Sequence, residues 1–127
     1  MEFPRNCLSF ALSKDCGVEE PEKGVDLIEE SRLVTFYERV EREQATLVGG
    51  LANKGNGVYK VDHLAWVPKP GSEQAIHRIG KGRDVENTTV REVMKPIIGS
   101  SAYEPLYLKR RKGVTAEEVA RELLNKR

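Results

Sequence analysis

The chain carries two kinds of apolar pattern, one with helical spacing and one with strand spacing. Helical spacing is clearest near the C-terminus, where Thr115 and Glu118 form a capping-box pattern ahead of an apolar stripe. A second helical pattern covers residues 31–42, although the β-branched and aromatic run at 33–37 leaves a strand as the alternative. These patterns predict helices at 31–42 and from residue 115 onward.

Strand-like patterns occupy the middle of the chain. Residues 45–52 and 58–67 are apolar runs joined by the glycine-rich segment 53–57, which predicts a hairpin. Gly49 and Gly50 favour a strand there, because each glycine costs a helix roughly 1 kcal/mol. Shorter strands are predicted at 25–30, 74–79 and 97–99, and a further helix at 88–94.

The resulting order, β-α-β-β-β-α-β-α, is typical of an α/β domain with a mixed sheet flanked by helices. Residues 25–127 are expected to form this single domain. Residues 1–24 are expected to be a separate N-terminal lead-in, because the acidic segment VEEPEKG, which contains both proline and glycine, closes them off.

Composition narrows the functional classes. The 127 residues are 39% hydrophobic and 32% charged, with a net charge of +1, which is typical of a globular protein and not of a nucleic-acid binder. The high charge density is common in proteins from hot environments. No apolar run is long enough to span a membrane, and the patch at residues 8–12 is too short for a signal peptide, so a cytoplasmic location is expected.

The cysteines and histidines give little sign of a metal site. Cys7 and Cys16 are expected to be buried thiols, with a disulfide as the alternative. Their spacing relative to His63 and His77 is poor for zinc. His63 lies on the apolar face of its predicted strand, which favours a core or interface histidine, and His77 has no partner at ligand spacing.

Three segments resemble motifs of the MPN/JAMM (Mov34-type) domain. EQATLVGGL at 43–51 is similar to the family's glutamate followed by a strand, and GVYKVDHLAWVPKPGS at 57–72 to its next strand. IIGSSAYEP at 97–105 is similar to the segment in which a strand ending in glycine presents His-x-His-Pro. The resemblance implies the MPN fold, with its cytidine-deaminase-like layering, over about residues 25–124.

The resemblance also implies where a zinc isopeptidase site would lie. Glu43 matches the catalytic glutamate, Ala102 and Glu104 match the two imidazole ligands, and Glu118 matches the aspartate ligand. Because no imidazole is retained, zinc is not expected, and no cofactor is assigned. Carboxylates alone suit a harder ion such as Mg²⁺ or Mn²⁺. Each glutamate also has a simpler role, as a solvated surface residue or, for Glu118, as part of the cap.

A basic run, Lys109, Arg110, Arg111 and Lys112, is a candidate for phosphate contact, with a solvated loop as the simpler interpretation. Because the net charge of the chain is close to zero, only weak contacts with phosphate are expected. The segment from residue 112 onward also resembles the first helix of a helix-turn-helix, but too little sequence follows for a second, reading helix.

The favoured hypothesis is therefore a non-catalytic MPN-like domain that binds a protein partner or a second copy of itself as a scaffold. One alternative is a small nucleic-acid-associated protein using residues 109–112. The other is a divergent metal-dependent hydrolase using Glu43, Glu104 and Glu118. The sequence favours neither an enzymatic activity nor an association with membranes. It does not identify the partner.

Overall fold

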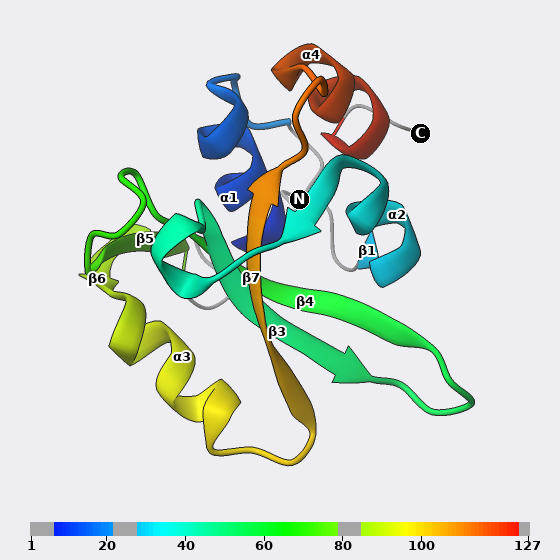
Figure 1. Cartoon of the computed structure of the whole chain (residues 1–127), viewed down its shortest axis with the longest axis vertical. Coiled ribbons are helices and arrows are strands. Elements are labelled where there is room, and N and C mark those ends of the chain that lie inside the picture. Colours follow the sequence, from blue (N-terminus) through cyan, green and yellow to red (C-terminus); the bar gives the residue numbers. More distant parts are fainter. Residues whose placement is uncertain (1–6, 22–27, 79–84, 125–127) are drawn as a thin grey trace, which may run out of the picture.

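The computed structural model describes residues 7–21, 28–78 and 85–124 (Figure 1). Its centre is a curled sheet in the order β2-β7-β3-β4-β5-β6, with β1 added beside β4. The strands are β1 (Ile28–Glu29), β2 (Tyr37–Arg39), β3 (Leu47–Asn53), β4 (Tyr59–Trp66), β5 (Gln74–Arg78), β6 (Val85–Thr89) and β7 (Tyr103–Arg110). Every strand pair described is antiparallel, whereas the sequence analysis expected a mixed sheet.

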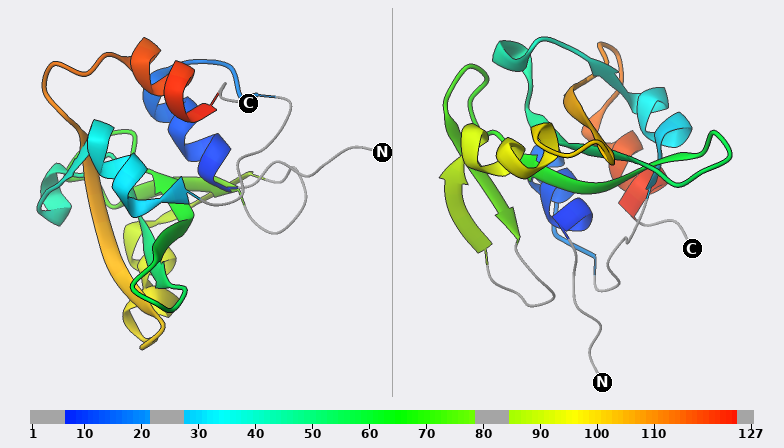
Figure 2. Two further views of the ribbon diagram at one scale, coloured as in Figure 1. Left: turned by 90° about the vertical axis from the view of Figure 1, so that its right-hand side faces the viewer. Right: turned by 90° about the horizontal axis from the view of Figure 1, so that it is seen from below.

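Helices cover the two faces of the sheet unequally (Figures 1 and 2). One face carries α1 (Cys7–Cys16), α4 (Ala116–Val119) and the π-turn η2 (Ala120–Leu124) that continues it. The other face carries α3 (Val90–Ile98). The elements α2 (Glu30–Phe36) and the 3₁₀ turn η1 (Arg42–Gln44) flank β2. The α/β class predicted from the sequence is confirmed at this level.

Strand β3 divides the apolar residues between two cores. Its side chains alternate, so Leu47 joins the cluster beneath α1 and α4 while Val48 joins the cluster beneath α3. The hairpin predicted at 53–57 is confirmed: Gly55 and Gly57 adopt positive φ angles, 90° and 75°, between β3 and β4. The pairing of β3 with β4 is interrupted by a bulge at Gly50/Leu51.

Helix α1 belongs to the main core and is not a detached lead-in. Leu8, Ala11 and Leu12 are each 0% exposed and pack in the same cluster as the sheet. Arg78 of β5, 6% exposed, forms an ion pair with Glu20 at 2.5 Å and so ties the segment after α1 to the sheet. The apolar patch that looked too short for a signal peptide is thus a core helix. The domain boundary predicted at residue 24 lies outside the described residues.

Helix α3 extends further than predicted. Thr89 caps it, accepting a hydrogen bond from the backbone N–H of Glu92, and it continues through Ile98. The strand predicted at 97–99 is wrong, because the helical stripe that begins at Val90 reaches Ile97, which is 5% exposed. Pro96 lies inside the helix, in its last turn.

Strand β7 occupies residues that the sequence analysis assigned to a loop. It pairs with β3 along most of its length and with β2 near its end. Leu106 and Leu108 are fully buried in the core beneath α1 and α4, with Tyr107 between them facing the other side. This alternation stabilises a central strand despite Pro105 and the charges around it.

Two other boundaries differ from the prediction. The helix expected at 31–42 ends at Phe36, and Tyr37 begins β2. The run at 33–37, for which a strand was the alternative, is therefore helical except at Tyr37. The strand predicted at 25–30 is reduced to Ile28–Glu29 among the described residues. The described segments contain no helix long and apolar enough to cross a membrane.

Candidate functional site

The three glutamates implied by the MPN/JAMM resemblance lie in separate parts of the molecule, and two of them make contacts unrelated to a metal site. Glu104 lies near the start of β7, where it accepts a hydrogen bond from Arg39 Nη1 at 2.9 Å. Glu118 completes the capping box with Thr115, accepting from the Thr115 backbone N–H at 3.2 Å. Glu43 is exposed in η1, and Ala102 lies in the turn before β7.

These glutamates are not arranged as a metal centre. Strand β7 carries the chain roughly 20 Å from Glu104 to Arg110, and Glu118 lies beyond that end. Ligands of one ion must each approach it to about 2.0–2.2 Å. Within the described segments, no group of three His, Cys, Asp or Glu side chains has metal-binding geometry. The segment 97–99, expected to be the strand that presents the ligands, is instead the end of α3 with Gly99 as its C-cap. The backbone there therefore differs from the one that the resemblance implied.

Part of the basic run is engaged in contacts within the fold. Lys109, Arg111 and Lys112 are exposed, and Arg111 donates from Nε to the carbonyl oxygen of Val34 at 2.7 Å, in the last turn of α2. Arg110 is half-buried near Cys16, and its Nη1 has no hydrogen-bond partner within the described residues. Two of the four side chains, Arg110 and Arg111, are therefore in contact with other parts of the fold.

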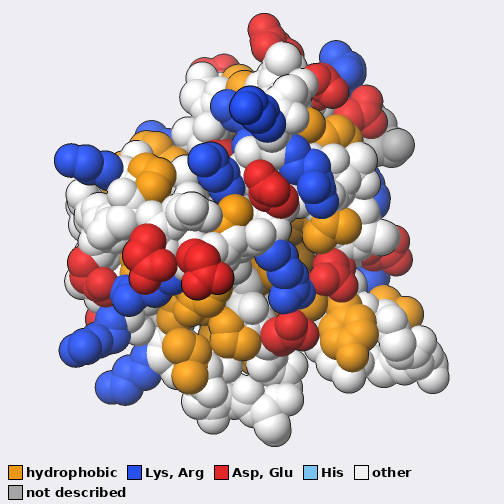
Figure 3. All heavy atoms as spheres, viewed as in Figure 1, with side chains coloured by type: hydrophobic (Ala, Val, Ile, Leu, Met, Phe, Trp, Pro, Cys, Tyr) orange, Lys and Arg blue, Asp and Glu red, His pale blue; other side chains and the backbone are white. Residues whose placement is uncertain are grey.

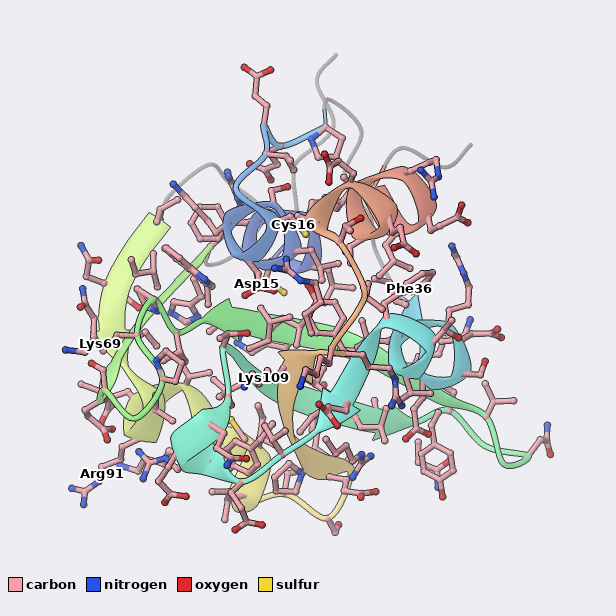
Figure 4. All side chains as sticks on the ribbon, turned by 45° about the horizontal axis from the view of Figure 1, so that its top comes forward. Asp15, Cys16, Phe36, Lys69, Arg91 and Lys109 are labelled. Carbon is pink, nitrogen blue, oxygen red and sulfur yellow. The ribbon has the colours of Figure 1, made fainter. Side chains whose placement is uncertain are left out.

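A buried polar cluster joins the end of α1 to β2 (Figure 4). The Tyr37 hydroxyl donates to Asp15 Oδ2 at 2.8 Å and lies 4.0 Å from Cys16 Sγ. Burial, and then the Asp15 charge, raise the pKa of Tyr37 far above its ordinary range. Burial also raises the pKa of Cys16, against smaller opposing effects of Tyr37 and Arg110. A thiol held neutral in this way is a poor nucleophile.

The alternative of a Cys7–Cys16 disulfide is excluded. Both residues lie on α1, nine positions apart, and both are free. A helix rises 1.5 Å per residue, so their Cα atoms are about 13 Å apart along the axis. Disulfides require Cα atoms within about 7 Å.

The two histidines are neighbours, which the sequence analysis missed. Their rings contact edge to face with centroids 5.5 Å apart, and His77 Nε2 lies 3.0 Å from Glu86 Oε1. His77 Nδ1 is buried without a hydrogen-bond partner within the described residues. The signal was available in the β4–β5 pairing, because Trp66 opposite Ile76 places residues 63 and 77 on one face.

His63 also lines a small hollow of about 310 Å³ on the α3 face of the sheet. Its other walls are Val93, Pro96, Ile97 and Tyr103. Gly50 lies against two of these walls, since a Cβ added there would come within 3.0 Å of Tyr103 and 3.2 Å of Ile97. The hollow is a mainly apolar gap left where one helix covers a curved sheet.

A larger hollow, of about 660 Å³, lies between α3, η1 and β7 (Figure 3). We call it the α3 hollow. Its lining combines apolar and charged side chains. It is lined by Arg42, Val90, Arg91, Glu92, Met94, Lys95, Ile98, Gly99 and Tyr107. Ile98 is 62% exposed, the most exposed large apolar residue among those described.

The charges at the edge of the α3 hollow are only partly neutralised. Arg42 forms an ion pair with Glu73 at 2.6 Å, and Glu73 also accepts from the Arg91 backbone N–H at 2.8 Å. These contacts, the backbone hydrogen bond foremost, lower the pKa of Glu73. The Arg91 and Lys95 side chains lie one helical turn apart, both exposed, and neither forms an ion pair with a described residue. Arg91 points away from the body of the protein (Figure 4).

Comparison of the sequence and structure with protein families, characterised proteins and solved structures gave no match.

Proposed function

We propose that the chain is a non-catalytic protein-binding module that works within a complex, and that its partner binds at the α3 hollow. The observation that carries the proposal is the exposure of Ile98 beside a concave surface. An isoleucine at 62% exposure leaves much apolar area in water, and burying such area contributes about 25 cal/mol per Å². Exposed apolar surface with a charged border is typical of interaction sites.

The position of Ile98 follows from the helical pattern. Val90, Met94 and Ile97 belong to the stripe that packs on the sheet. Ile98 lies off that stripe, so it contributes nothing to the core and remains beside the hollow. An isoleucine at position 98 therefore adds little to the stability of the fold. It would, however, offer an apolar contact surface to a side chain of a partner.

The charges indicate the partner's chemistry. Arg91 and Lys95 are like charges at i and i+4, an arrangement that destabilises an isolated helix by a few tenths of a kcal/mol. A carboxylate from a partner would relieve this repulsion, while Glu92 on the same edge limits the excess of positive charge. We infer that the partner presents a short segment with one large apolar residue flanked by Asp or Glu.

The chemistry of the lining supports binding more than catalysis. The hollow is lined by guanidinium, ammonium, carboxylate, thioether and phenol groups, without a histidine, cysteine or serine side chain. It thus provides contacts and charges, and it offers no serine or cysteine nucleophile beside a histidine base. The predicted MPN resemblance stays compatible with this role, since members of that family without metal ligands act as scaffold subunits.

A random peptide library tests the proposal even while the partner is unidentified. Peptides of about twelve residues would be selected on the immobilised wild-type chain and their affinities measured by fluorescence polarisation. We expect enrichment of an aliphatic or aromatic residue beside Asp or Glu. Ile98→Asp should weaken the selected peptides at least about tenfold.

Two controls make the result specific. Val58→Asp alters another exposed apolar residue, 39% exposed and in the β3–β4 loop, and should leave affinity unchanged. Arg91→Glu with Lys95→Glu should shift selection towards basic peptides, while Lys112→Glu should not. Failure to enrich any motif, or equal binding to wild type and Ile98→Asp, would overturn the proposal.

A further inference from the structure

Strand β6 forms one edge of the sheet, and nothing described covers it. Within the described residues it pairs only with β5, over the full length from Val85 to Thr89. Figure 2 (right) places it as the outermost strand, with α3 leaving it towards one face of the sheet and not across the edge. The outward main-chain N–H and C=O groups of β6 are therefore available to another strand.

This edge lacks the usual protection against strand addition. Natural edge strands carry lysine, proline or a bulge, or are very short. The sequence of β6 is VENTT, with three β-branched residues and one charge, and its five residues pair with β5 without a bulge. The opposite edge, β2, is only three residues long. The two edges of the sheet thus differ in their capacity to accept a strand.

The sequence of β6 is complementary to itself when two copies run antiparallel about Asn87. In that register Asn87 faces Asn87 of the second copy, Val85 faces Thr89, and Glu86 faces Thr88. No like charges meet, the amides can hydrogen-bond to one another, and the β-branched pairs match common cross-strand contacts. Val85, 46% exposed in the single chain, would be partly covered.

Neighbouring registers are poorer. Centring the pair on Glu86 would bring two carboxylates opposite one another, which is destabilising in a sheet. Centring it on Thr88 would leave Glu86 opposite Val90, the first residue of α3, so fewer strand residues could pair. Asn87 is thus the centre that uses all five residues without a charge conflict.

We propose that two copies of this chain associate through antiparallel pairing of their β6 strands about Asn87, which joins two sheets into one. Five paired residues provide about four to six main-chain hydrogen bonds. An interface this narrow is of the small, transient class, so the dimer forms and dissociates with protein concentration. The pairing uses an edge of the sheet, and the lining of the α3 hollow on α3 begins at Val90, the residue after β6.

Sedimentation equilibrium over about 1–500 µM protein tests the pairing. The wild type should rise from the chain mass of 14.3 kDa towards twice that value. Asn87→Asp and Asn87→Lys place like charges on the two-fold axis, and each should raise the dimer dissociation constant at least about tenfold. An equimolar mixture of the two variants should restore association, because opposite charges then meet.

The control is Asn53→Asp, which alters an exposed asparagine at the end of β3 and keeps the oxygen that accepts from the Gly55 backbone N–H. It should associate as the wild type does. A wild type that stays monomeric throughout, or a dimer that neither Asn87 variant weakens, would overturn the proposal.

The two proposals fail separately. Asn87 variants should keep the affinity for the selected peptides, whereas Ile98→Asp should keep the wild-type dependence of mass on concentration. Loss of peptide binding in the Asn87 variants would mean that the α3 hollow depends on the dimer. That result would contradict the independence of the two surfaces.

Discussion

The two faces of the sheet are built from side chains of different size. The face beneath α1 and α4 is rich in leucine and is fully covered. Its strand residues include Leu47, Leu51, Val61, Leu64, Leu106 and Leu108. The fully buried strand residues beneath α3 are smaller, namely Val48, Gly50, Ala65, Val67 and Ala75, and the partly buried Tyr103 and Tyr107 of β7 pack against them.

This difference in side-chain size explains why the hollows lie on the α3 side of the sheet. Large side chains fill the space between the sheet and several helices, whereas small ones let a single helix approach closely and leave gaps on either side of it. The α3 hollow and the smaller hollow beside His63 both border α3. One face therefore stabilises the fold, and the other leaves concave surface exposed, where we propose that a partner binds.

The largest expected effect concerns the covered face. Leu12→Ala should lower the free energy of unfolding by about 3 kcal/mol, because the side chain is fully buried between α1 and the sheet. Val93→Ala on α3 should cost about half as much. Urea unfolding measures both. A loss below about 1 kcal/mol for Leu12→Ala would mean that α1 is a dispensable lead-in after all.

Adjacent glycines of β3 compare the faces directly. A Cβ at Gly49 would lie 1.9 Å from the His63 carbonyl oxygen, so the backbone of β4 must move. A Cβ at Gly50 meets only the side chains of Tyr103 and Ile97, at 3.0 and 3.2 Å. We expect Gly49→Ala to cost about 3 kcal/mol and Gly50→Ala about 1 kcal/mol. Equal losses in urea unfolding would refute the proposed difference in packing.

Alkaline pH should destabilise the covered face. The pKa values of Cys16 and Tyr37 are raised above their ordinary 9.0 and 10.0. As pH rises past those values the unfolded chain loses protons that the folded chain keeps, so the free energy of unfolding falls. The loss approaches about 1.4 kcal/mol per pH unit for each group.

Two readouts test this pH dependence. One of the four tyrosines should ionise only when the protein unfolds, as followed by tyrosinate absorbance. Tyr37→Phe should remove that tyrosine and reduce the alkaline slope. Ionisation of all four tyrosines while the fold persists would contradict the buried position of Tyr37.

A smaller effect is expected where α4 begins. Thr115→Ala should cost about 1 kcal/mol, because its side chain accepts from the Glu118 backbone N–H. Glu118→Gln should be nearly neutral, since glutamine also completes a capping box, and Glu117→Ala serves as the control. Calorimetry with and without Mn²⁺ separates this role from metal binding. A Mn²⁺-dependent stabilisation lost in Glu118→Gln would favour a ligand.

Local signals predicted local structure well. The glycines of the β3–β4 hairpin, the Thr115–Glu118 capping box and the helix beginning near residue 88 were all recognisable from short patterns. Errors arose where tertiary packing decides. Helix α1 and strand β7 depend on burial against partners distant in sequence, which local patterns do not report.

The candidate site was harder to predict for the same reason. The α3 hollow joins Arg42, residues 90–99 and Tyr107, which meet only because η1 and β7 flank α3. One local clue existed, namely the like charges of Arg91 and Lys95 one turn apart, but it depends on first recognising the full length of α3. The glutamates matched by family resemblance were assigned from spacing alone, and their contacts are unrelated to one another.

The most direct test of the account is to compare stability and binding in one variant. Ile98→Asp should change the free energy of unfolding by less than about 0.5 kcal/mol, because the residue is exposed and off the packed stripe. The same variant should bind the library-selected peptides at least about tenfold more weakly than wild type. Unchanged stability with unchanged affinity would contradict the claim that the α3 face is a binding surface.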